Sequence, residues 1–112
     1  MDAFEIAQLI DERKRRNRPY LEFLRMSSLS LGLYALPAGG VDRQQPHSED
    51  EVYYVVSGRA AIRVDGEDRA VEAGSVVFVK AGVTHHFHSL AEDLVVLVFF
   101  APAEYSRAST AP

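Results

Sequence analysis

The sequence predicts an all-β domain, an antiparallel sandwich or barrel that is preceded by a short helix. The first observation is a series of eight short β-type runs after residue 19, each ended by turn residues. The second is the composition: of the 112 residues 47% are hydrophobic and 25% are charged, as in ordinary globular chains. This length leaves room for one core, so we expect a single domain rather than separate cofactor and substrate modules.

Residues 2–16 have the pattern of a short amphipathic helix. Asp2 and Glu5 have the spacing of a capping box, and apolar residues recur along one side. The last turn is basic, which suits the C-terminal end of a helix, and Pro19 prevents continuation. The basic cluster could meet an anionic partner or a membrane surface, but the neighbouring acidic residues favour a solvated helix end. We therefore assign residues 1–19 to an N-terminal helical extension.

Residues 20–102 have the pattern of a β-domain. The second run has leucine at alternate positions, and the breaks between runs combine glycine with serine, aspartate or alanine. Residues 103–112 show no periodicity and are predicted to form a loose C-terminal tail. The predicted strands are residues 20–26, 29–36, 51–56, 59–64, 69–72, 75–79, 84–89 and 94–100.

The composition excludes several classes of protein. The absence of cysteine rules out disulfides, thiolate metal sites and a cysteine nucleophile, so any metal must bind through nitrogen and oxygen. A formal net charge of −4 disfavours nucleic acid as a partner. No apolar run approaches the roughly 20 residues of a membrane-spanning helix, and the acidic N-terminus is unlike a signal peptide. We expect a cytoplasmic protein with no membrane or nucleic-acid partner.

Histidine and carboxylate side chains occur close together in two segments. His47 lies four residues before Glu51, and the other three histidines lie at positions 85, 86 and 88. Imidazole and carboxylate are suitable ligands for a divalent transition metal. If His47, Glu51 and His85 converge, they form a two-histidine, one-carboxylate set with open coordination positions, as in non-haem iron oxygenases. The alternative is that these histidines lie near strand ends with no ligand role.

The spacing of these residues resembles the first of two signature motifs of the cupin superfamily, G(X)5HXH(X)3–4E(X)6G. The matching segment runs from Gly39 to Gly58, with His47 and Glu51 at the expected positions. Its one departure is Gln45, which occupies the position of the first histidine.

A second segment is similar to the other cupin motif, G(X)5PXG(X)2H(X)3N. Gly74, Gly82 and His85 match it, whereas Lys80 replaces the usual proline and Ser89 the usual asparagine. Together the two motifs and their spacer cover about half of the chain. The positions of the glycines also suit turns that residues with a Cβ atom resist.

The resemblance implies a jelly-roll β-barrel with a metal ion in its mouth. By position the metal ligands would be His47, Glu51 and His85, with Gln45 in the place of the missing histidine. A glutamine oxygen is a neutral and weaker donor than imidazole, so we expect lower affinity or an open fourth position. The ion would be Fe, Zn, Ni or Mn. The alternatives are that the metal has been lost and the barrel binds an organic ligand directly, or that the protein is catalytically inert.

Strand alternation places the residues around this site. If His85 faces inward, Phe87 also faces inward, and His86 and His88 face outward. Tyr53 shares a face with the predicted carboxylate ligand and could donate its hydroxyl to a substrate, although packing in the core is the simpler interpretation. We take Tyr53 and Phe87 as candidate substrate-binding residues in a mostly apolar lining.

Function is only partly determined by this resemblance, because cupins include dioxygenases, isomerases and cyclases as well as proteins without catalytic activity. We expect a stand-alone metal-binding cupin, an enzyme acting on a small organic molecule. Iron would favour oxygen activation, whereas zinc, nickel or manganese would favour Lewis-acid chemistry of an isomerase or cyclase. The alternative is a non-enzymatic module that binds a small molecule or a metal.

We also expect the protein to associate. A small barrel has much surface for its volume, so we expect a homodimer formed through residues 2–26.

Overall fold

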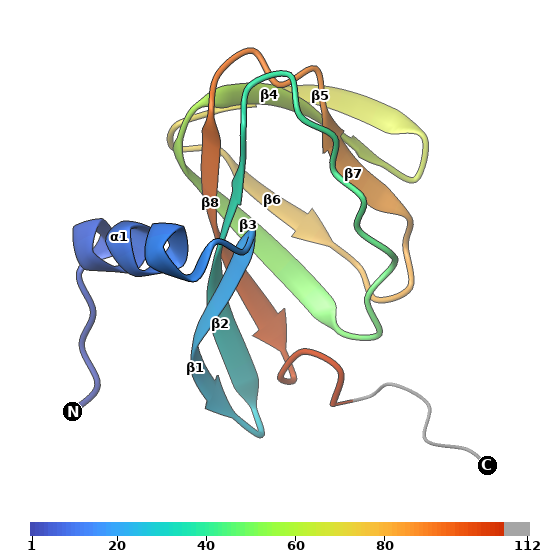
Figure 1. Ribbon diagram of the computed structural model, residues 1–112. Coiled ribbons are helices and arrows are strands. Elements are labelled where there is room, and N and C mark those ends of the chain that lie inside the picture. The colour runs from blue at the N-terminus through green and yellow to red at the C-terminus, as the bar shows by residue number, and fades with distance from the viewer. Residues whose placement is uncertain (107–112) are drawn as a thin grey trace.

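The computed structural model describes residues 1–106, which form one helix and eight strands arranged as two antiparallel sheets (Figure 1). The predicted all-β, jelly-roll fold is confirmed, and each predicted strand is present with its ends shifted by at most two residues. The elements are α1 (Ile6–Arg16), β1 (Tyr20–Met26), β2 (Leu29–Leu36), β3 (Asp50–Ser57), β4 (Arg59–Val64), β5 (Glu67–Glu72), β6 (Val76–Val79), β7 (His85–His88) and β8 (Leu94–Ala101).

The two sheets have different sizes. The larger has the strand order β1-β2-β8-β3-β6, and the smaller has the order β5-β4-β7. Strand β8, the last in the described residues, pairs with both β2 and β3 and is therefore the central strand of the larger sheet. In the smaller sheet Asp65 and Gly66 join β4 to β5 with φ of 50° and 81°, as a type I′ hairpin turn requires.

The hydrophobic core lies between the two sheets. In β8 every second side chain is buried, because successive residues of a strand point to opposite faces. The side chains between them face outward, towards α1 or solvent. The core residues with at most 3% of their surface exposed are Tyr53, Val55, Ile62, Val71, Val79, Phe87, Leu94, Val96, Val98 and Phe100.

Helix α1 covers part of the outer face of the larger sheet. Its one buried residue, Leu9, packs with Leu21 of β1 and Leu33 of β2. Asn17 ends the helix in the left-handed conformation, and its backbone N–H donates to carbonyls of the last turn. Among residues 1–106 there is no helix long and apolar enough to cross a membrane.

The helix begins later than its sequence pattern predicts. Its first residue is Ile6, and Glu5 at the N-cap is extended and makes no side-chain capping bond, so the predicted capping box from Asp2 is wrong. The ring of Phe4 instead packs edge-to-face on Phe23 of β1, with 4.9 Å between centroids. This contact with the sheet keeps the preceding residues out of the helix.

Residues 103–106 return to the sandwich after β8. The backbone N–H of Glu104 donates to the hydroxyl of Ser30 (2.9 Å), and that of Tyr105 donates to the carboxylate of Glu49 (2.7 Å). Glu49 and Glu104 are 1% and 9% exposed. The predicted loose tail therefore does not begin at residue 103, and the part of that prediction beyond residue 106 lies outside the described residues.

A buried aspartate holds the long loop between β2 and β3. Asp42 accepts hydrogen bonds from the Tyr34 hydroxyl (2.6 Å), the Gln44 side-chain amide (2.6 Å) and the Phe87 backbone N–H (2.8 Å). Because β7 lies at the edge of its sheet, this carboxylate satisfies a backbone group that a neighbouring strand would otherwise pair. The loop is thereby tied to β2 and to β7, on either side of the core.

Candidate metal centre

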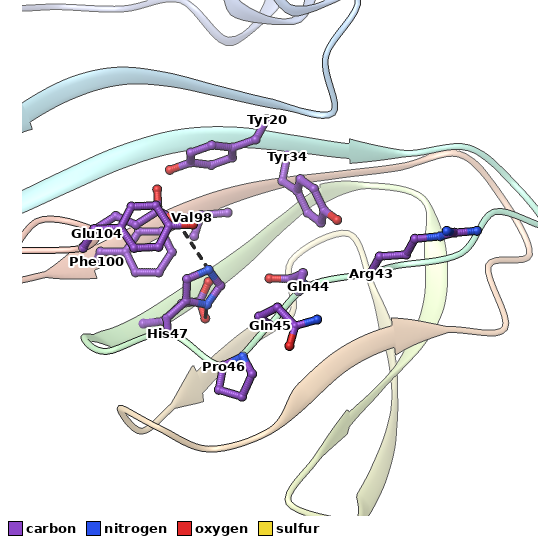
Figure 2. Close-up of a pocket in the computed structure, with 12 residues that line it drawn as sticks. Tyr20, Tyr34, Arg43, Gln44, Gln45, Pro46, His47, Val98, Phe100 and Glu104 are labelled. Carbon is purple, nitrogen blue, oxygen red and sulfur yellow. Dashed lines mark ion pairs between the residues drawn. The ribbon is translucent and has the colours of Figure 1, made fainter. Parts of the chain in front are cut away.

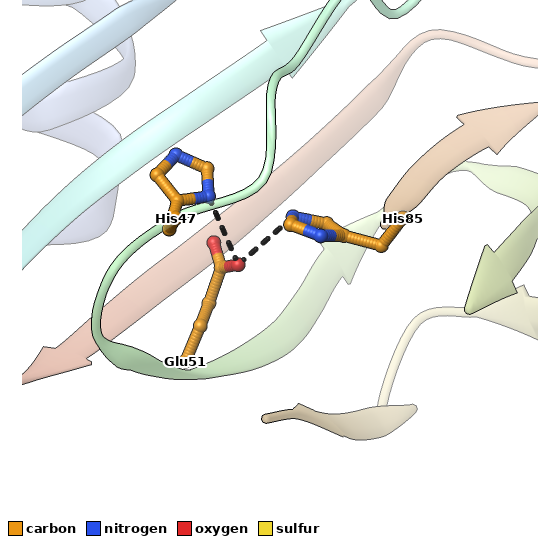
Figure 3. A group of neighbouring side chains, drawn as sticks. All are labelled: His47, Glu51 and His85. Atoms are coloured by element: carbon orange, nitrogen blue, oxygen red, sulfur yellow. Dashed lines mark ion pairs between the residues drawn. The ribbon is translucent and has the colours of Figure 1, made fainter. Parts of the chain in front are cut away.

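Three side chains from separate segments converge at one end of the sandwich (Figure 3). Glu51 is the second residue of β3, a strand held between β6 and β8. His85 is the first residue of β7, and His47 lies in the loop that leads into β3. The structure thus brings together the three residues that the sequence motifs place in a metal site.

Two hydrogen bonds, each donated by a backbone N–H group, join the two motif segments. The N–H of Gly82 donates to the carbonyl of His47 (2.7 Å), and the N–H of Ala81 donates to the carboxylate of Asp50 (2.9 Å). Gly82 has a φ of +79°, a conformation that favours glycine. The turn before β7 is therefore held against the loop before β3, and this sets the distance between the two histidines.

The ligand atoms are close together and buried. His85 Nε2 lies 3.0 Å from Glu51 Oε1, and His47 Nδ1 lies 3.5 Å from the same oxygen. One ligand atom from each residue fits within a mutual distance of 4.8 Å. The side chains are 11% exposed for His47 and 1% for Glu51 and His85. The three residues could hold a metal ion through two nitrogens and one carboxylate.

Several of these polar atoms have no hydrogen-bond partner. His47 Nδ1, both carboxylate oxygens of Glu51, and His85 Nε2 are buried and unsatisfied. Such groups are costly unless something satisfies them. The other ring nitrogen of His85, Nδ1, lies 2.9 Å from the carbonyl of Val83, to which it can donate, leaving a lone pair on Nε2. A divalent cation between the three residues would satisfy all of these atoms, so the donor set fits a metal.

The electrostatics also suit a cation. Burial would raise the pKa of Glu51, but the imidazoles of His47 and His85 outweigh it and keep the pKa below its usual value. Burial would lower the pKa of His47, but Glu104 and Glu51 outweigh it and raise the pKa to about 9. The site therefore concentrates negative charge from carboxylates around two imidazoles.

A cavity of about 420 Å³ opens beside this cluster (Figure 2). Burial raises the pKa of Tyr20, which keeps its hydroxyl protonated, and this hydroxyl has no hydrogen-bond partner. The Tyr20 ring lies across Gly32, where a Cβ atom would come within 2.1 Å of it. The lining residues are Tyr20, Tyr34, Arg43, Gln44, Gln45, Pro46, His47, Glu51, Val98, Phe100, Glu104 and Tyr105.

Among the other predicted site residues, Tyr53 packs beside the cluster, with 6.0 Å between its ring centroid and that of His85. Gln45 lines the cavity, but its side chain is exposed on the loop. Tyr53 and Phe87 are buried in the core and are not among the lining residues; the Tyr53 hydroxyl donates to Gln44 (2.8 Å). His86 and His88 alternate with the buried residues of β7 and are half-buried, as the strand pattern predicts.

Sequence reasoning missed three residues that shape the site. Glu104 lies beside His47, and Asp42 holds the loop between β2 and β3. Gln44 accepts a hydrogen bond from the Tyr53 hydroxyl. None of them belongs to the histidine and carboxylate spacing that identified the cluster. Their roles depend on contacts between distant segments, for which the sequence carries no local signal.

The fold and the cluster define a small jelly-roll protein with a group of residues that could hold a metal. The sequence matches the family described as "Cupin domain" over residues 32–100. The chain therefore belongs to the cupin family, and the resemblance found in its motifs is confirmed.

Individual proteins are similar to this chain in sequence or in structure. The chain is 56% identical over 104 residues to "Uncharacterized protein SCO3923" of Streptomyces coelicolor, covering 93% of this chain and 99% of that protein. The structure of TT1209 from Thermus thermophilus is similar with a TM-score of 0.74 and 26% identity, over 92% of this chain and 99% of that one. DMSP lyase DddQ from Ruegeria pomeroyi shares the fold, with a TM-score of 0.66, 24% identity, and coverage of 77% of this chain and 42% of that one.

Proposed function

We propose that this cupin binds a divalent metal through His47, Glu51 and His85 and acts on a small organic molecule in the adjoining cavity. The observation that carries the proposal is the set of buried, unsatisfied ligand atoms that converge there. Four such atoms without a ligand would be costly to the fold. A bound cation would remove that cost and would create a reactive centre beside the cavity that His47 and Glu51 line.

Each residue has a defined part in this function. The two imidazoles supply neutral donors once the metal has displaced the extra proton that the raised pKa of His47 favours, and Glu51 supplies the negative charge that a divalent ion needs. When bound, Fe, Zn, Ni or Mn would supply Lewis-acid polarisation or, for iron, oxygen activation. Gln45, on the open side of the cavity, stays a candidate weak fourth ligand.

The cavity favours a small molecule with an apolar body and at least one oxygen atom. Val98 and Phe100 offer apolar surface, and the unpartnered hydroxyl of Tyr20 is available as a donor. Tyr53 and Phe87 would support the lining of the cavity from the core rather than contact the substrate. The Tyr53 hydroxyl holds the lining residue Gln44 in place by a hydrogen bond. Dioxygenase, isomerase and cyclase reactions all fit such a substrate.

The first test is the metal content of protein purified without chelators or added metal. We expect about one divalent ion per chain by elemental mass spectrometry, and loss of that ion in His85→Ala. His86→Ala is the matched control, because the neighbouring histidine faces outward and should leave the content unchanged. Wild-type protein without metal that also fails to bind added metal would contradict the site.

A second measurement separates an enzyme from a binding module. The metal-loaded protein is incubated with pools of small oxo and hydroxy acids, and oxygen consumption is recorded in parallel. Turnover that disappears in His85→Ala supports catalysis at the cluster. Binding of a pool member without any turnover supports the non-enzymatic module.

We also propose a homodimer, with a contact surface different from the one the sequence suggested. Leu9 and Leu21 of the predicted interface are buried within the chain. Phe4 and Met26 are exposed in that segment, but three exposed apolar side chains gather on the outer face of β3 and β6: Tyr54, Val76 and Phe78 (41%, 66% and 60% exposed). Because β6 is an edge strand, a two-fold arrangement would let this surface cover itself.

The association state is measured by light scattering at micromolar concentration. We expect a dimer for the wild type and a monomer for Phe78→Glu, because the new charge would be buried without a partner. Val41→Glu, which changes an exposed residue of the long loop, should remain dimeric. A monomeric wild type would contradict the proposal.

A further inference from the structure

The ring of His47 lies between the carboxylates of Glu51 (Figure 3) and Glu104 (Figure 2). Its Nδ1 atom is 3.5 Å from Glu51 Oε1, on the side of the metal-ligand cluster. Its Nε2 atom is 3.3 Å from Glu104 Oε2, and the side chains of His47 and Glu104 are both 11% exposed. Glu104 therefore contacts the nitrogen that points away from the other two ligands.

The backbone around Glu104 is firmly held. Its N–H donates to Ser30 (2.9 Å), and its carbonyl accepts from the guanidinium of Arg25 (2.7 Å). The next N–H, of Tyr105, donates to the buried carboxylate of Glu49. These three bonds attach the residues after β8 to β1, β2 and the long loop, so the Glu104 carboxylate is presented to His47 by a fixed segment.

We propose that Glu104 is a positioning residue for the metal ligand His47, an inference that rests on the proposed metal site. By accepting the Nε2 proton, its carboxylate leaves the lone pair on Nδ1, directed at the cluster, and fixes the ring orientation. The carbonyl of Val83 does the same for His85 from the opposite ring nitrogen. The two histidines thus have different supports, one a backbone carbonyl and the other a carboxylate from the end of the chain.

The charge of Glu104 adds to its geometric role. A carboxylate hydrogen-bonded to a ligating imidazole increases the basicity of that imidazole. His47 belongs to a loop, whereas His85 and Glu51 belong to strands, so His47 is the ligand with the greatest need of such support. Glu104 acts on the metal only through this ring.

The test is zinc affinity, measured by chelator competition on folded protein. We expect Glu104→Ala to weaken zinc binding by about 10- to 100-fold, the usual effect of removing a carboxylate behind a histidine ligand. Glu104→Gln, which retains an oxygen that can accept the Nε2 proton, should recover most of this loss. Glu67→Ala, an exposed carboxylate on β5, is the control and should bind as the wild type does.

A double-mutant cycle shows whether Glu104 acts through His47. In the His47→Ala background, Glu104→Ala should cause no further loss of affinity. An equal loss in both backgrounds would make Glu104 a direct ligand and overturn the proposal, as would unchanged affinity for Glu104→Ala. Wild-type protein that does not bind zinc would overturn the metal site itself, and the positioning role with it, so the two failures are distinguishable.

Discussion

Replacing Glu51 with glutamine is expected to lower the affinity for a divalent metal by at least about 100-fold, or roughly 2.7 kcal/mol. The change keeps the size and shape of a side chain that is 1% exposed, but it removes the negative charge of the cluster. The lowered pKa of Glu51 keeps that charge in place at neutral pH. An amide is also a poorer ligand than a carboxylate for these metals.

Thermal unfolding with and without added metal provides the measurement. An ion that binds only the folded state raises the melting temperature, and at 100 times its dissociation constant it contributes about 2.7 kcal/mol. We expect this increase in the wild type and in the exposed control Glu67→Gln. In Glu51→Gln the increase should be small or absent at the same metal concentration. An undiminished increase would remove Glu51 from the ligand set.

Gly58→Ala is expected to be the most destabilising single substitution among the turn glycines with positive φ. Gly58 joins β3 to β4 with a φ of +98°, and a Cβ atom there would lie 2.2 Å from the carbonyl oxygen of Asp93 and 2.8 Å from the Cα atom of Leu94. These are backbone atoms at the start of β8, so they cannot rotate aside as a side chain could. Strained φ and overpacking together should cost about 2–5 kcal/mol.

Gly66→Ala is the matched control for this prediction. Gly66 also has a positive φ, of +81°, but no atom lies within 4 Å of the added methyl group. Its cost should be limited to the backbone strain, about 1–2 kcal/mol. Urea unfolding of both variants gives the comparison, and equal destabilisation would show that the approach of Asp93 to Gly58 has no energetic importance.

Part of the candidate site could be predicted from the local spacing of residues in the sequence. His47 and Glu51 are close in sequence, and alternation along β7 correctly separated His85 and Phe87 from His86 and His88. The cupin motifs then linked two segments that local patterns cannot link. The helix start was predicted wrongly because Phe4 packs on Phe23, a contact that outweighs the local capping signal.

By itself, the sequence determined the strands, the turns between them and the three residues of the cluster. The strands and turns follow from patterns over a few residues, namely the alternation of side chains and turn residues that accept positive φ. The three residues of the cluster follow from the spacing within two separate cupin motifs. The tertiary structure alone decided that Asp42 joins the loop to β2 and β7, that Tyr20 crosses Gly32, and that Glu104 reaches His47. These contacts join residues far apart in the chain, and they exist only because the sandwich brings their segments together; no local pattern of charge or hydrophobicity encodes such pairs.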